Sequence, residues 1–336
     1  MDFPHVCLGI GDGMQPCTLA IDVGGSAIKV AYGTADGRLE EPRSIAIADV
    51  RARGDLIRGI VERICLALEA APPHLDAKSV GLVVPGNVDE VAGIGRHSII
   101  LGWRDIPFGQ LVTEATGLPV RVGHDVSAGA LAEGWWGAAR GHTEWLFLAL
   151  GTGLGSAFVL GGVPYRGFNG YGGELSHVVA LRDGPRCRCG KRGCLEMLAS
   201  ASAVVDRYVE ASGTSGPITA AEVARRVRDG DPAAVEVWDQ AVRALAVVAS
   251  GYVESMNPSA IVVGGGLAES GGLLLDPFRE QLYTQVHFAD RPEVHPAALG
   301  ASAGVWGAAL LGLGAAGIQL STPTPALSPA RSSAGA

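Results

Sequence analysis

The sequence IDVGGSAIKV, at residues 21–30, places an apolar run on each side of a Gly-Gly pair. An apolar strand, a tight glycine turn and a second apolar strand are typical of a β-hairpin. A similar unit, LALGTGLGSAFV, returns at residues 148–159 around a Gly-Thr-Gly-Leu-Gly turn. Because one such unit opens each half of the chain, we predict an α/β fold with duplicated halves and a central cleft between them.

The alternative is a single doubly wound sheet, and the two glycine turns argue against it. In that fold the glycine turn runs from a strand into a helix, whereas both turns here run from strand to strand. Apolar periodicity predicts the other elements. They are strands at 79–86 and 119–125, a strand, glycine turn and helix at 258–270, and helices at 52–71, 126–141, 198–252 (interrupted near 213–219) and 300–314.

Composition and charge exclude several classes of protein. The chain has 336 residues, of which 48% are hydrophobic and 18% charged, and a formal net charge of −8. No uncharged apolar run reaches about 18 residues, and the N-terminus lacks the basic and apolar segments of a signal peptide. No lysine- or arginine-rich block is present, which disfavours nucleic-acid binding. Three of the six cysteines are scattered, as in a cytoplasmic protein rather than a disulfide scaffold.

The length favours about two domains. We predict a leader at 1–17, an N-terminal α/β lobe at 18–125 and a C-terminal α/β lobe at 126–315. The last predicted helix is rich in small residues. It belongs by sequence to the C-terminal lobe, and the sequence leaves open whether it packs back on the N-terminal lobe. Residues 322–336 are rich in Pro, Ser and Ala, which predicts a disordered tail.

The two glycine turns are candidate phosphate-binding loops. Glycines let the backbone approach a phosphate, so that successive N–H groups point at its oxygens. In the first loop, Ser26 adds a hydroxyl donor, Lys29 a positive charge, and Asp22 a ligand for Mg²⁺. Either loop alone is more often only a tight turn, but one loop per half suggests a nucleotide held between lobes. The predicted nucleotide-binding residues are Asp22, Gly24, Gly25, Ser26, Lys29, Gly151, Thr152, Gly153 and Gly155, with Gly264 and Gly265 covering an adenosine.

Asp125 lies between a predicted strand and a predicted helix. One interpretation is a helix N-cap, a position at which aspartate is favoured. The other is a general base that faces the cleft, since a helix N-terminus keeps a carboxylate ionised and sets its direction. The two roles are compatible, and both stay open from the sequence.

The segment GELSHVVALRDGPRCRCGKRGCLE, residues 173–196, holds one histidine and three cysteines in a short span. One imidazole and three thiolates match a closed tetrahedral zinc site. The alternative, a disulfide with a spare cysteine, is disfavoured because C-x-C is too tight for ordinary disulfide geometry. Glu174 and Glu196 bracket the segment and offer hydrogen-bond acceptors to a polyhydroxy ligand. The predicted zinc ligands are His177, Cys187, Cys189 and Cys194.

Together these motifs make residues 18–315 resemble the ROK family of sugar kinases and repressors, within the two-lobed actin-like ATPase (ribonuclease H-like) superfold. The resemblance implies ATP, Mg²⁺, a structural zinc, a hexose-like acceptor phosphorylated on a primary hydroxyl, and a homodimer. It implies Asp125 as the catalytic base. It also implies that Glu174, His177 and Glu196 hydrogen-bond the ring hydroxyls of the acceptor.

Three positions depart from the pattern of the family's kinases. His124 replaces the Asn that usually precedes the catalytic Asp, Ile100 replaces the Asn that usually precedes the Leu-Gly-Trp element, and Ser176 replaces a Gly. Loss of an amide that pairs with a sugar hydroxyl costs about 1–3 kcal/mol. His124 and Ile100 therefore predict an altered acceptor, such as a C7 cyclitol. Neutral drift at an ordinary hexokinase site is the alternative.

Two functions other than a kinase are compatible with parts of the sequence. One is a sugar-binding sensor without turnover, which the two lost Asn residues favour and the retained Asp125 opposes. The other is a transcriptional regulator of the same family without its DNA-binding domain. Regulators of that kind carry a winged-helix domain before the first glycine loop, whereas only 21 residues precede Asp22.

Overall fold

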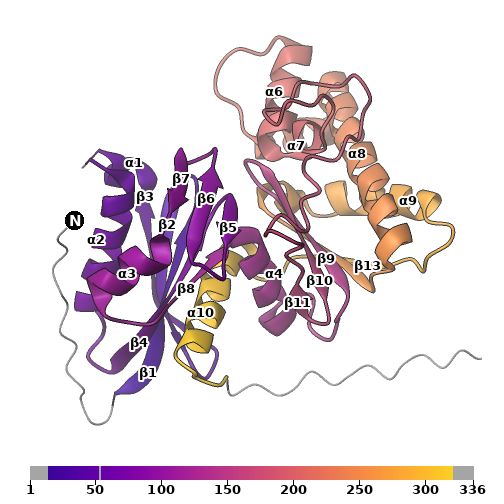
Figure 1. The fold of residues 1–336 in the computed structure, drawn as a ribbon. Coiled ribbons are helices and arrows are strands. Elements are labelled where there is room, and N and C mark those ends of the chain that lie inside the picture. Colours follow the sequence, from indigo (N-terminus) through magenta and orange to yellow (C-terminus); the bar gives the residue numbers. More distant parts are fainter. Residues whose placement is uncertain (1–13, 53, 321–336) are drawn as a thin grey trace, which may run out of the picture.

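The computed structural model describes residues 14–52 and 54–320. Most of the predicted leader (1–17) and all of the predicted tail (322–336) lie outside the described residues. Two lobes stand side by side, with the helices α4 (Asp125–Trp136) and α10 (Ala303–Ala315) between them (Figure 1). Among the described residues, no helix combines the length and apolar character needed to cross a bilayer.

The two lobes contain five-stranded sheets with the same strand order. The N-terminal sheet has the order β3-β2-β1-β4-β8, and the C-terminal sheet has the order β11-β10-β9-β12-β13. In each, the first three strands are antiparallel and the last two pair in parallel. The strands are β1 (Gln15–Val23), β2 (Ala27–Thr34), β3 (Leu39–Ala46), β4 (Leu75–Val84), β8 (Val120–His124), β9 (Trp145–Leu150), β10 (Leu154–Leu160), β11 (Val163–Pro164), β12 (Ala260–Gly264) and β13 (Glu293–Pro296). The duplicated architecture predicted from the two glycine hairpins is confirmed.

A third sheet, the helix that follows it and a later helix in the C-terminal lobe were not predicted. The small antiparallel sheet β5 (Asn87–Asp89), β6 (Ile94–Ser98) and β7 (Trp103–Ile106) is followed by α3 (Phe108–Thr116). In the C-terminal lobe, η1 (Gly266–Ser270) and α9 (Gly272–Gln285) follow β12. The strands of the third sheet are too short to show a clear alternation of apolar and polar residues.

All the predicted helices differ somewhat in their bounds. The helix predicted at 126–141 already ends at Trp136, and the one predicted at 300–314 begins at Ala303. The other two differ more. The helix predicted at 52–71 is α2 (Leu56–Glu69), because the Asp55 carboxylate accepts a hydrogen bond from the Arg58 N–H and caps the helix there. A separate short helix, α1 (Ile47–Arg51), precedes it. The region predicted at 198–252 contains four helices, because two further breaks occur, at the extended Ser200 and at Gly230, whose φ is +81°. They are α5 (Glu196–Ala199), α6 (Ala201–Ser212), α7 (Ala220–Arg228) and α8 (Pro232–Met256).

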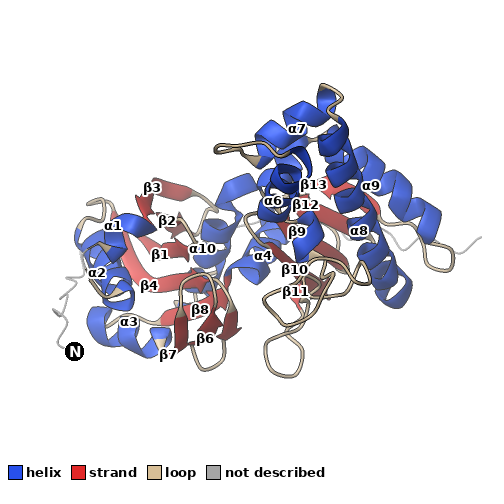
Figure 2. Ribbon diagram, turned by 90° about the horizontal axis from the view of Figure 1, so that it is seen from above, coloured by secondary structure: helices blue, strands red, loops and turns tan. Residues whose placement is uncertain are grey.

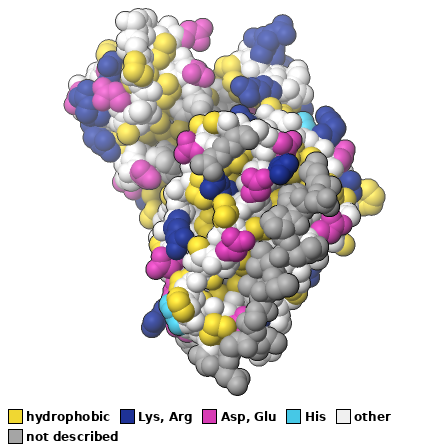
Figure 3. Space-filling model, turned by 90° about the vertical axis from the view of Figure 1, so that its left-hand side faces the viewer, with side chains coloured by type: hydrophobic (Ala, Val, Ile, Leu, Met, Phe, Trp, Pro, Cys, Tyr) yellow, Lys and Arg dark blue, Asp and Glu magenta, His cyan; other side chains and the backbone are white. Residues whose placement is uncertain are grey.

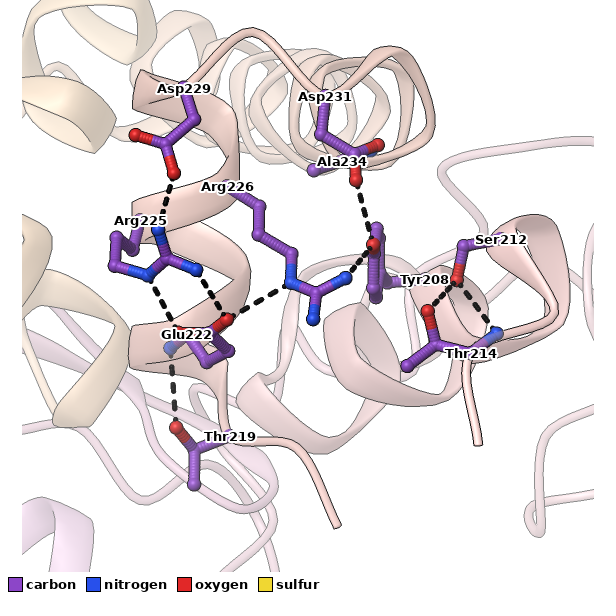
Figure 4. Close-up of polar contacts among 10 residues, drawn as sticks. All are labelled: Tyr208, Ser212, Thr214, Thr219, Glu222, Arg225, Arg226, Asp229, Asp231 and Ala234. Carbon is purple, nitrogen blue, oxygen red and sulfur yellow. Dashed lines mark hydrogen bonds and ion pairs between the residues drawn. The ribbon is translucent and has the colours of Figure 1, made fainter. Parts of the chain in front are cut away.

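The helices α6, α7 and α8 form a cap on the C-terminal lobe (Figure 2). Tyr208 of α6 is buried, and its hydroxyl lies between two charged groups (Figure 4). It donates to the Asp231 carboxylate at 2.8 Å and accepts from the Arg226 guanidinium at 2.5 Å. Because Asp231 also caps α8, this one side chain joins all three helices. The three helices of the cap are therefore linked to one another through this hydroxyl.

The last helix returns to the N-terminal lobe. α10 packs against β1, β2 and β4 and against α4. Small residues allow this close approach: a Cβ on Gly81 of β4 would collide with the Ala308 carbonyl oxygen, and one on Gly307 with the Ala128 carbonyl oxygen. Trp136 of α4 and Trp306 of α10 also pack against each other, with ring centroids 4.7 Å apart and ring planes tilted by 50°. The two segments that connect the lobes are thereby packed on each other.

A buried carboxylate links the two segments that connect the lobes. Glu133 of α4 has no exposed surface. Its Oε2 accepts from the Ala138 N–H at 2.8 Å and the Ala298 N–H at 3.1 Å, and its Oε1 accepts from the Leu299 N–H at 2.8 Å. The segment containing Ala298 and Leu299 leads into α10, so Glu133 ties one connection between the lobes to the other.

Replacing Glu133 by alanine is expected to lower the free energy of unfolding by about 3–5 kcal/mol, because it leaves buried N–H donors without an acceptor. Equilibrium unfolding in urea measures the change. The exposed Glu114 of α3 serves as the control, since its replacement by alanine is expected to cost less than about 0.5 kcal/mol. A decrease in the free energy of unfolding below about 1 kcal/mol for the Glu133 variant would show that Glu133 does not hold the two connecting segments together.

Charged side chains of both signs are interspersed on the face of the molecule shown in Figure 3. Apolar side chains lie between them on that face.

Candidate active site

A cleft of about 480 Å³ lies between the lobes. Its lining comes from both glycine hairpins, the start of α4, the third sheet and the segment before the cysteines. The predicted site residues that line it are Gly25, Ile100, His124, Asp125, Gly151, Thr152, Gly153, Gly155, Glu174, His177, Glu196 and Gly265. Asp22, Gly24, Ser26, Lys29 and Gly264 belong to the same loops but do not line it.

The first glycine turn is closed by a hydrogen bond from the Gly24 N–H to the Ala27 carbonyl oxygen at 2.8 Å. Gly25 lies at the tip, and a Cβ built on it would be 2.9 Å from the Ile100 Cγ2. The predicted phosphate loop and the predicted acceptor residue therefore touch. Ile100 is 55% exposed and presents an apolar surface to the cleft.

Asp22 lies at the end of β1, almost fully buried. Its carboxylate is 3.6 Å from the Lys29 Nζ, which also donates to the Ala301 carbonyl oxygen. Burial raises the pKa of Asp22 to about 6, Lys29 opposes that rise, and the nearby Asp125 carboxylate adds to it. Asp22 is therefore a buried acid close to the cleft that is ionised at neutral pH at a cost to stability.

Replacing Asp22 by asparagine is expected to stabilise the ligand-free protein at neutral pH. The rise of the pKa from 3.8 to about 6 corresponds to roughly 3 kcal/mol. A raised pKa stabilises the folded state only while the proton is bound, so this contribution is complete below about pH 4 and is lost as the pH rises through 6. The variant should therefore match wild type at pH 4 and exceed it by about 1–3 kcal/mol at pH 7.5, since unpaired Lys29 offsets part of the gain.

Urea unfolding at the two pH values measures this difference. The exposed Asp206 provides the control, and its replacement by asparagine should change stability by less than about 0.5 kcal/mol at either pH. If the Asp22 variant is no more stable than wild type at pH 7.5, the buried charge is not destabilising.

Asp125 is the first residue of α4, and the N-cap is His124, whose side chain makes no capping hydrogen bond. The N-cap interpretation of Asp125 therefore does not hold. Its Oδ1 accepts from the Val126 N–H at 2.8 Å and lies 3.1 Å from the His124 Nε2. The side chain is 29% exposed and opens into the cleft.

Burial raises the pKa of Asp125, and the Glu174 carboxylate raises it further. The His124 ring and the backbone N–H groups of the helix N-terminus oppose the rise. A carboxylate whose pKa is raised is a stronger base when ionised, and it faces a cleft large enough for a small molecule. The position and environment suit a general base.

The part of the cleft formed by residues 174–196 contains two carboxylates on adjoining segments. The Ser176 N–H donates to the Glu174 Oε1 at 3.2 Å, and the Ser176 hydroxyl donates to the same atom. The Glu196 N–H donates to the Ser176 carbonyl oxygen at 2.9 Å. A Cβ on Gly153 would be 2.9 Å from the Glu196 Oε1, so this carboxylate reaches the second glycine loop. Both carboxylates border the cleft and can accept hydrogen bonds from hydroxyl groups.

The histidine and three cysteines converge on one point. The ligand atoms of His177, Cys187, Cys189 and Cys194 all lie within 4.8 Å of one another. The Cys187 Sγ is 3.6 Å from the His177 Nδ1, and the Cys189 Sγ is 3.5 Å from the Cys194 Sγ. Tetrahedral zinc bonds of about 2.0–2.3 Å separate neighbouring ligands by about 3.6–3.8 Å. All three thiols are unpaired, so the disulfide alternative is not seen.

Sequence reasoning missed several residues that line the cleft. The main ones are Gly86, Asn87, Ser98, Ile99, Tyr171 and Arg188. A Pro-Gly-Asn turn directly after the buried strand β4 is the signal that points to Asn87. Arg188 lies between Cys187 and Cys189, and only these two cysteines were assigned a role in the metal prediction.

Residues 18–314 match the model of the ROK family. The chain is 34% identical over 306 residues to the glucokinase of Thermotoga maritima, covering 87% of this chain and 95% of that protein. It is 32% identical over 317 residues to the kanosamine kinase of Amycolatopsis mediterranei, covering 90% and 98%. The structure of a ROK family glucokinase from Streptomyces griseus, in complex with glucose and AMPPNP, superposes with a TM-score of 0.76 at 30% identity, covering 88% and 99%.

Proposed function

Because the chain belongs to the ROK family and has its actin-like ATPase fold, we propose that it is an ATP-dependent kinase of a hexose or hexose-like acceptor. The observation that carries the proposal is the meeting of three groups in one cleft. These are the base candidate Asp125, the glycine loops of both lobes, and the carboxylates Glu174 and Glu196. A kinase needs each of them: a base for the hydroxyl, backbone donors for the phosphates, and acceptors for the sugar hydroxyls.

In the proposed reaction, Glu174, His177 and Glu196 hold the acceptor, and its primary hydroxyl points at the Asp125 carboxylate. Asp125 accepts the hydroxyl proton as the oxygen attacks the γ-phosphorus, and the bond from that phosphorus to the bridging oxygen of ADP breaks. The backbone N–H groups around Gly25 and Gly153 bind the phosphate oxygens. Asp22 is the residue placed to hold Mg²⁺, directly or through water, and the metal would neutralise charge on the phosphates.

We propose that the cluster of His177 and the three cysteines holds one structural zinc ion. The spacing of the ligand atoms and the donor set support this. Four protein ligands leave no open position, so the metal has no role in the chemistry. Its role is to order residues 173–196, which contain few regular elements and supply Glu174 and Glu196 to the cleft.

The acceptor is proposed to differ from glucose where it meets Ile100. That side chain has no hydrogen-bonding group, and it borders the cleft beside Gly25. A C7 cyclitol is one such acceptor, and kanosamine is another because a relative phosphorylates it. Homodimer formation, which the family resemblance implies, stays a prediction.

Release of ADP from Mg·ATP should be measured with glucose, mannose, N-acetylmannosamine, glucosamine, kanosamine and C7 cyclitols. We expect turnover on at least one of them. An altered acceptor predicts that Ile100→Asn and His124→Asn shift the ratio of kcat/KM toward glucose by about tenfold or more. Glucose as the best substrate of the wild type would make both residues tolerated variants. No ADP release with any of these compounds, together with intact ATP binding, would contradict the kinase function and favour a sugar-binding sensor.

A further inference from the structure

A loop of the C-terminal lobe crosses to the N-terminal lobe beside the cleft. It comprises residues 165–172 and follows β11. Its base is closed by a hydrogen bond from the Gly172 N–H to the Arg166 carbonyl oxygen at 2.9 Å. Near its tip, Gly170 has a φ of +86°, and a Cβ on it would be 3.0 Å from the Val88 carbonyl oxygen of β5. We call this segment the crossing loop.

An ion pair reinforces the crossing. The Arg166 guanidinium pairs with the Oε2 of Glu90, which follows β5 in the N-terminal lobe. The Glu90 side chain is only 8% exposed, whereas that of Arg166 is 42% exposed. A carboxylate that is so largely removed from water needs partners for its charge. Arg166, from the other lobe, is one of two.

The second partner lies beside the proposed base. The Glu90 Oε1 accepts from the backbone N–H of His124 at 3.2 Å. His124 is the N-cap of α4, and its Nε2 is 3.1 Å from the Asp125 Oδ1. The same ring contacts the Ser127 hydroxyl at 3.3 Å. A continuous chain of polar contacts therefore runs from Arg166 through Glu90 and His124 to Asp125.

The two partners of Glu90 depend on each other. If the crossing loop lifts, Arg166 leaves, and a poorly hydrated carboxylate retains only one neutral donor. That state is disfavoured, so Glu90 turns toward water and releases the His124 N–H. The turn that begins α4 then loses the contact that fixes it. Engagement of the loop therefore preserves the hydrogen bond made by the His124 N–H, which belongs to the peptide next to Asp125.

We propose that Glu90 is a positioning residue that couples engagement of the crossing loop to the orientation of Asp125. The proposal rests on the kinase function given above. The crossing loop also supplies Gly170, Tyr171 and Gly172 to the cleft lining, so an acceptor in the cleft favours the engaged loop. Asp125 is then aligned when acceptor is present and less well aligned when only water is, which limits wasteful hydrolysis of ATP.

The kinetic test uses Arg166→Ala, Glu90→Gln and the double variant. Glu90→Gln retains an oxygen for the His124 N–H but loses the charge that holds Arg166. Each single variant is expected to lower kcat for acceptor phosphorylation about 10- to 100-fold, with the KM for ATP changed less than about twofold. ADP formed per phosphorylated acceptor should rise, Arg166→Lys should restore part of kcat, and the double variant should be no worse than the worse single one.

The matched control is Arg96→Ala. Arg96 pairs with Asp89 at 2.7 Å in the same small sheet, but within one lobe and outside the cleft lining. Its loss should leave kcat and the ADP-to-product ratio unchanged. Single variants of Arg166 and Glu90 within about threefold of wild type, or losses that multiply in the double variant, would overturn the coupling.

Amide hydrogen exchange tests the coupling without any turnover. In Arg166→Ala, the amides of residues 124–126 should exchange at least about tenfold faster than in wild type, and in Arg96→Ala they should not. Unchanged exchange in Arg166→Ala would overturn the proposal even for an active enzyme. Faster exchange in a protein that phosphorylates no acceptor would support the contact chain while contradicting the kinase function.

Discussion

Replacing Asp125 by asparagine is expected to lower kcat for phosphoryl transfer by a factor of about 10²–10⁴, the range typical of a general base. The amide keeps the shape of the side chain and can still accept from the Val126 N–H, but it cannot take the hydroxyl proton. Burial and Glu174 raise the pKa of Asp125, so the loss removes a base that is stronger than an ordinary aspartate.

Initial rates with saturating ATP and the best acceptor measure this loss, and nucleotide affinity is measured beside them. The dissociation constant for Mg·ATP should change less than about threefold, because the glycine loops are untouched. Glu114→Gln is the control and should keep the wild-type rate, because Glu114 is exposed on α3 and does not line the cleft. A variant of Asp125 that retains more than about a tenth of the rate would reject it as the base.

The raised pKa of Asp125 also predicts the pH dependence. Activity requires the ionised base, so kcat/KM should fall as the pH falls through that pKa. Glu174 raises the pKa of Asp125, and Glu174→Gln should therefore move the midpoint of the fall to lower pH. His124 lowers it, and His124→Asn should move the midpoint to higher pH. Shifts in the same direction would show that these two groups do not set the protonation of Asp125.

Replacing Cys194 by serine is expected to release the proposed zinc ion and to destabilise the C-terminal lobe by several kcal/mol. Structural zinc contributes an apparent binding free energy of about 10–16 kcal/mol in small zinc domains, and here it would order the segment between β11 and α5. Cys194 is fully buried, so a serine left without metal also places an unpaired hydroxyl in the interior. The acceptor affinity should fall with the stability, because Glu174 and Glu196 belong to the same segment.

Metal content by mass spectrometry and thermal unfolding measure these two effects. Cys65→Ala is the control: Cys65 is buried in α2, outside the cluster, and its replacement should leave one zinc per chain. Treatment of the wild type with a strong chelator should reproduce the Cys194 variant. Untreated protein that contains no zinc would contradict the assignment of the site.

The site was predictable in its parts but not in its connections. The glycine turns, Asp125 and the cysteine motif are each visible within a few residues, because turn formation and metal ligation need particular residue types at close spacing. The roles assigned to them stay predictions, although the cleft brings most of them together. No functional role was predicted for Arg166 or Glu90, because neither is unusual in its own segment and Asp89-Glu90 is typical of a turn.

The sequence by itself determined the strands of the two glycine hairpins, their turns and the duplicated halves, because these follow from local patterns of apolar residues and glycines. It also predicts the four zinc ligands, whose side chains the structure places close together. Only the tertiary structure decided that Glu133 ties α4 to the return segment, that burial raises the pKa of Asp22, and that Glu90 lies between Arg166 and the peptide of His124. The physical reason is that the desolvation and pairing of a charge depend on segments that are distant in the sequence and meet only when the chain folds.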